Sequence, residues 1–139
     1  MTVQAERDLL QALFELDFAR FAQRSVALDP ADGRCGRLID AAFRLAVRWH
    51  FDDAVPFMTV AHFVADALGQ MGEGKQDLNL PLAERLVNAA LRGRTLAGLD
   101  RQEVLQVQIL LIYRIVVDGH LSYDEQHALL ADAEALMVV

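Results

Sequence analysis

Apolar residues recur every three or four positions along most of this chain, a spacing typical of amphipathic α-helices and unlike the alternation of strands. Residues 3–27 follow this spacing with a wide apolar face. The apolar positions of that face are Leu9, Leu10, Leu13, Phe14, Phe18 and Phe21. The pattern therefore predicts one long first helix over residues 3–27.

Proline, glycine and aspartate residues interrupt the helical pattern in two places. Residues 29–33 read Asp-Pro-Ala-Asp-Gly, and Pro30 disfavours helical geometry at the residue before it. Residues 72–77 contain two glycines and no apolar residue, so the segment 72–79 is the best candidate for a mobile loop. The expected helices cover about residues 3–27, 35–51, 54–71, 80–93, 101–117 and 123–139.

Two four-residue segments, 100–103 and 122–125, match the capping box that satisfies free amide groups at a helix start. The first precedes residues 104–117, which are rich in valine and isoleucine and would also suit a strand. The length of this run and the capping box before it favour a central buried helix.

The length of 139 residues is near the commonest size of one domain, so we expect a single helical domain over residues 1–139. About six helices with no convincing strand pair indicate an all-α fold, a single compact bundle.

The chain carries 13 basic and 20 acidic residues, a formal net charge of −7 that opposes broad binding to nucleic acid or anionic membranes. An electrostatically steered partner should be cationic. The longest apolar stretch, residues 104–117, is interrupted by polar side chains and is shorter than the roughly 20 residues of a membrane span. A polar N-terminus and a single cysteine fit neither a signal peptide nor a disulfide, so we expect a cytoplasmic protein.

Histidine and carboxylate residues occur at helical spacing in two places and could bind a metal ion. His62 and Asp66 are four residues apart, Asp124 and His127 are three apart, and His120 lies just upstream. If the two helices faced each other, these groups could form a site like those of helical metal proteins. The alternative is that each pair belongs to a solvated polar stripe.

Part of the second pair overlaps the segment 117–125, which matches the second half of a calcium-binding EF-hand loop. Asp118, Gly119, Ser122 and Glu125 fit that half, but arginine and valine occupy the first two ligand positions. A helix end followed by a capping box explains the same residues. The helix, Asp-Gly, helix pattern also resembles the TerB-like group of tellurite-resistance domains, which are acidic, all-helical and of similar length. The resemblance implies a cytoplasmic, stress-related module that could associate with metal.

Basic residues gather around the end of the fourth expected helix, at Arg85, Arg92, Arg94 and Arg101. Guanidinium groups bind phosphate and carboxylate groups in a bidentate manner, so the cluster is a candidate anion or nucleic-acid contact. The chain has 12 arginines and one lysine, however, and ordinary solvated helix ends also account for the cluster.

The only cysteine, Cys35, lies near a helix start between Arg34 and Arg37, an environment that could favour a reactive thiolate. The alternative is a small buried core residue. No nucleophile elbow, P-loop or dinucleotide fingerprint is present, and no cofactor is indicated.

Most expected helices have wide apolar faces, and the chain ends in four apolar residues at 136–139, which suggests more apolar surface than one small core can bury. The alternative is a monomer whose apolar count is raised by alanine, a residue that a bundle surface tolerates. The leading hypothesis is a non-enzymatic protein-interaction module of the adaptor, chaperone or inhibitor type. It would act as a homodimer or with a basic partner. A small metal-binding helical protein and an anion-binding or nucleic-acid-binding protein are the alternatives.

Overall fold

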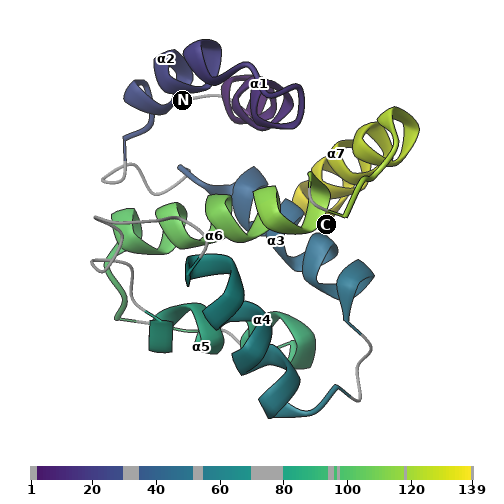
Figure 1. Cartoon of the computed structure of the whole chain (residues 1–139). Coiled ribbons are helices and arrows are strands. Elements are labelled where there is room, and N and C mark those ends of the chain that lie inside the picture. Colours follow the sequence, from purple (N-terminus) through teal and green to yellow (C-terminus); the bar gives the residue numbers. More distant parts are fainter. Residues whose placement is uncertain are drawn as a thin grey trace.

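The structure, a computed structural model, describes residues 3–29, 35–51, 55–69, 80–93, 96, 98–117 and 119–138. All regular structure in these ranges is helical, which confirms the predicted all-α fold, although there are seven helices where about six were expected (Figure 1). The helices are α1 (Val3–Phe14), α2 (Phe18–Val26), α3 (Arg37–His50), α4 (Phe57–Gly69), α5 (Leu80–Arg92), α6 (Arg101–Val116) and α7 (Tyr123–Val138). None of them has the length and apolarity that a bilayer crossing requires.

Helix α3 lies at the centre of the bundle. It packs most extensively against α6 and α7, and also against α5 and α1. The pair α1 and α2 lies on one side of α6, and α4 and α5 lie on the other (Figure 1). The largest buried side chains of α3 and α6 form the middle of the core: Leu38, Ile39, Phe43, Leu111 and Ile112.

The prediction of one long helix over residues 3–27 is wrong, because the chain breaks between α1 and α2. Leu16 adopts the left-handed conformation with φ of 61°. Its N–H donates to the Leu13 carbonyl at 3.1 Å, and the Asp17 N–H donates to the Ala12 carbonyl at 2.9 Å, which together form a Schellman motif. Asp17 then caps α2 by accepting from the Arg20 N–H at 3.2 Å. The apolar spacing continues across this break, so periodicity alone did not reveal it.

The other expected helices are confirmed with shifts of a few residues at their ends. Ser122 and Glu125 form the predicted reciprocal capping box, with N–H to side-chain distances of 2.9 Å and 3.2 Å. Asp100 caps α6 by accepting from the Gln102 N–H at 3.1 Å. The predicted mobile segment 72–79 lies outside the described residues.

The start of α3 takes its cap from another helix. Gly36 stands at the N-cap position and has no side chain with which to accept from the first amides. Instead, Glu6 of α1 accepts from the N–H groups of Leu38 and Ile39 through Oε1, at 3.1 Å and 3.3 Å. Glu6 is only 2% exposed, and its burial raises the pKa of the carboxyl above 4.5. Hydrogen bonds from the α3 backbone and the charge of Arg101 oppose that rise without cancelling it.

Helix α6 also contacts the start of α3. The Arg101 guanidinium donates to the carbonyl oxygen of Cys35, the residue before Gly36. Gly36 has φ of 84°, and a Cβ added there would lie 2.5 Å from Leu105 Cδ2. Only glycine adopts this left-handed conformation without strain. A side chain at this position would also collide with Leu105 of α6. We call this meeting point of α1, α3 and α6 the α3 junction.

We predict that Glu6→Ala lowers the free energy of unfolding by about 1–3 kcal/mol, because two buried amides lose their acceptor. Glu6→Gln keeps an acceptor oxygen and should cost less. The measurement is urea unfolding of both variants and the wild type.

The same series tests the pKa of Glu6. Because the pKa of Glu6 is raised in the folded state, the contribution of Glu6 to stability is fully present below pH 4.5. This contribution is lost as the pH rises through the folded-state pKa. Glu6→Gln removes the titrating group, so its stability should decline less than that of the wild type over this window. Equal stability of all three proteins would contradict the proposed role of Glu6.

Candidate functional site

A groove of about 680 Å³ lies between α2 and α6, with Leu13 of α1 also lining it. From α2 come Phe18, Phe21 and Ser25. From α6 come Leu105, Ile109 and Tyr113, among others. This volume is within the range of about 300–1,000 Å³ that is common for binding pockets. We call this feature the α2–α6 groove.

The position of α2 explains why the groove is open. Helix α2 packs chiefly on α1 and contains no buried residue. Its residues Phe18, Phe21 and Ser25, spaced three and four apart, form the face that lines the groove. The rings of Phe18 and Tyr113, with centroids 6.4 Å apart, bring the two walls together at one point.

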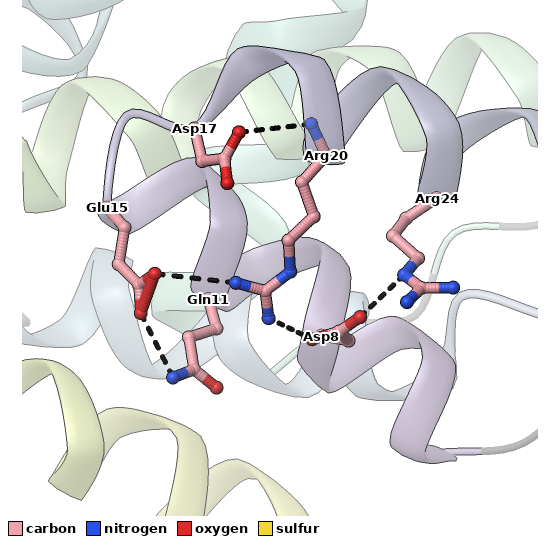
Figure 2. A network of polar contacts seen from close by, with 6 residues as sticks. All are labelled: Asp8, Gln11, Glu15, Asp17, Arg20 and Arg24. Atoms are coloured by element: carbon pink, nitrogen blue, oxygen red, sulfur yellow. Dashed lines mark hydrogen bonds and ion pairs between the residues drawn. The ribbon is translucent and has the colours of Figure 1, made fainter.

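Charged side chains hold α2 on α1 (Figure 2). Asp8 of α1 pairs with Arg20 and with Arg24, the second pair at 2.5 Å, and Glu15 pairs with Arg20 at 3.4 Å. The hydrogen bond from Arg20, followed by its charge and the Arg24 contacts, holds the pKa of Asp8 below 3.8 despite some desolvation. The polar face of α2 is thus anchored to α1.

The lining of the groove is mostly apolar, and its Phe18 side chain is 55% exposed. Leu16 and Val26, on the same part of the chain, are also exposed, at 49% and 86%, but do not line the groove. The described residues that line the groove carry no charge, and their polar groups belong to Ser25, Tyr113 and two glutamines of α6. With an uncharged and mostly apolar lining, the groove is suited to binding apolar surface.

The predicted metal ligands lie on separate elements. His62 and Asp66 are exposed on α4, and Asp66 lies 3.8 Å from the Arg114 guanidinium. Asp124 and His127 are on α7, where the His127 ring lies tilted against the Tyr123 ring with centroids 4.2 Å apart. His120 is exposed between α6 and α7.

Within the part of the chain that the structure describes, no three His, Cys, Asp or Glu residues gather as metal ligands would. Asp118 of the calcium-loop pattern lies outside that part. The described residues therefore do not form the predicted metal site, which stays a prediction.

The arginines of the predicted cluster contact different parts of the structure. Arg92 lies 4.3 Å over the Phe57 ring and donates to Asn88 Oδ1 at 3.0 Å, so it bridges α4 and α5. Arg101 belongs to the α3 junction, and Arg85 is exposed on α5. Arg94 lies outside the described residues.

Cys35 is fully buried at the α3 junction. A reactive cysteine needs access to solvent, and this position favours the alternative of a small core residue.

No family model, no curated protein and no solved structure matches this chain. The comparisons therefore add no support to the likeness with the TerB-like group.

The sequence did not reveal the α2–α6 groove, because its pattern places Phe18 and Phe21 on one face of a single long helix and predicts a central buried helix over residues 104–117. One signal was present in Asp17, a preferred N-cap residue inside the supposed long helix. A helix start there would have separated residues 18–26 as a short helix with only two large aromatic residues to bury.

We predict that Asp8→Asn loosens α2 while leaving the rest of the fold intact, because the variant loses the anion shared by Arg20 and Arg24. Amide hydrogen exchange in α2 should accelerate roughly twofold to tenfold at neutral pH, the size expected for partly exposed ion pairs. Asp132→Asn, which neutralises an exposed carboxylate on α7, is the matched control. Unchanged exchange in α2 of Asp8→Asn would show that these ion pairs do not hold the helix.

Proposed function

We propose that this protein is a non-enzymatic interaction module that forms a homodimer through the α2–α6 groove. The observation that carries the proposal is an uncharged groove of about 680 Å³ whose lining includes the exposed side chain of Phe18. Burial of apolar surface of this kind is the main source of affinity in permanent protein contacts.

A second copy is the occupant that fits this surface best. A two-fold dimer brings the same patch of both copies together, so the patch must complement itself. Phe18 lines the groove and is 55% exposed, so a two-fold arrangement would bring the Phe18 ring of each copy against the groove of the other. This interface would bury side chains that are otherwise left in water.

The charge of the surface supports the same choice. Each chain carries −7, but the described lining of the groove has no charged side chain that would repel an identical chain at close range. A basic partner would need carboxylates in the groove, and the described lining offers none. The expected cytoplasmic location is kept as part of this proposal.

We predict that the wild-type protein sediments at twice the chain mass of 15.5 kDa and that Phe18→Glu or Ile109→Glu shifts it to monomer. Each variant places an unpaired carboxylate in an apolar interface, which should weaken the dimer at least about tenfold. Phe18 is 55% exposed, so its substitution should leave the fold intact, as circular dichroism can verify.

Met58→Glu is the matched control, because Met58 is an exposed apolar residue, 66% exposed, on α4 and does not line the groove. Sedimentation velocity over a range of concentrations measures all four proteins. A monomeric wild type, or a dimer that only Met58→Glu disrupts, would refute the proposal.

A further inference from the structure

A second cavity, of about 380 Å³, lies among α3, α5 and α6 and next to residues 98–99. Its apolar lining includes Phe43 of α3, Leu86 of α5 and Val104 of α6. Three arginines also line it: Arg37 and Arg44 from α3, and Arg101 from α6. We call this feature the arginine cavity.

The cavity is basic although the chain is acidic. Asp40 is the one carboxylate among the described residues that line it, so three guanidinium groups face one acid in a chain of net charge −7. Asp40 is already engaged, because it lies 3.1 Å from Arg44 Nε and accepts from Gln108 Nε2 at 2.9 Å. It therefore offsets chiefly the charge of Arg44.

The other two guanidinium groups retain donors for a ligand. Arg101 donates to the Cys35 carbonyl, and Glu6 offsets part of its charge, but a guanidinium carries five N–H donors. Arg37 is the first residue of α3 and is exposed. Both side chains line the cavity, so an anion placed there can accept from two arginines of different helices.

We propose that the arginine cavity binds a small organic anion with an apolar body. The anionic group, a carboxylate or a phosphate, accepts from Arg37 and Arg101, and the body packs on Phe43, Leu86 and Val104. The volume lies within the range of small-molecule sites, and an apolar lining with a few convergent polar groups is their usual chemistry. Arg101 was a predicted anion ligand from sequence, but its partners here come from α3 and not from α5.

Two dyes of nearly equal shape test the charge requirement. The probes are 8-anilinonaphthalene-1-sulfonate, which carries an anionic group on an aromatic body, and N-phenyl-1-naphthylamine, which has a similar body without the charge. Fluorescence titration of the full chain gives an affinity for each. We expect Arg37→Gln to weaken binding of the sulfonate dye at least about fivefold, the loss of one charge-assisted contact, and to leave the neutral dye unaffected.

The controls separate this site from general surface charge. Arg48→Gln removes an exposed arginine from the same helix that does not line the cavity, and it should change neither affinity. Arg37→Lys keeps the charge but loses the fork of donors, so its affinity should fall between those of wild type and Arg37→Gln.

Added sodium chloride should weaken binding of the sulfonate dye to the wild type, because salt screens a partly exposed ion contact. Equal losses in Arg37→Gln and Arg48→Gln, or no loss in either, would overturn the proposal. The oligomeric state does not enter these comparisons, so they stand or fall separately from the proposed dimer.

Discussion

The buried carboxylate of Glu6 is the interaction on which the arrangement of the helices depends. The central helix α3 begins at a glycine that offers no capping side chain, so its first amides need an acceptor from elsewhere. Glu6 provides it from α1, and Arg101 of α6 binds the preceding carbonyl, so three helices meet at one place. An ionisable group with 2% exposure is costly to bury, and its hydrogen bonds to α3 are what offset that cost.

The α3 junction also determines where both cavities lie. By fixing α1, it places α2 beside α6, because α2 is held on α1 by the ion pairs of Asp8 (Figure 2). The α2–α6 groove is the space that results. On the other side of the junction, Arg37 and Arg101 line the arginine cavity. Packing at one helix start thus creates one apolar and one basic recess in a small acidic protein.

Much of the fold could be predicted from local sequence signals. The expected helix over residues 104–117 is present as α6, and the helix starts predicted at residues 100 and 122 are both found, with a full capping box at the second. The break at Leu16 was missed because a left-handed leucine has no sequence signature, and the apolar spacing continues through it. The role of Glu6 could not be predicted from local sequence, because its hydrogen-bond partners lie more than 30 residues away in the chain.

The candidate sites were harder to predict, because they depend on which side chains distant helices bring together. The predicted arginines of α5 and α6 point to different neighbours, while Arg101 joins arginines of α3 that sequence reasoning left aside. Phe18 and Ile109 are apolar residues of the kind found in cores. They line a groove because α2 does not pack closely against α6.

The most direct test of the central claim, that the α2–α6 groove pairs two copies of the chain, is hydrogen exchange at increasing protein concentration. Helix α2 has no buried residue in the single chain, so its amides should exchange fast when the protein is dilute. We predict that exchange in α2 slows as the dimer forms, while exchange in α4 is unaffected. Exchange in α2 that is the same at every concentration would contradict it.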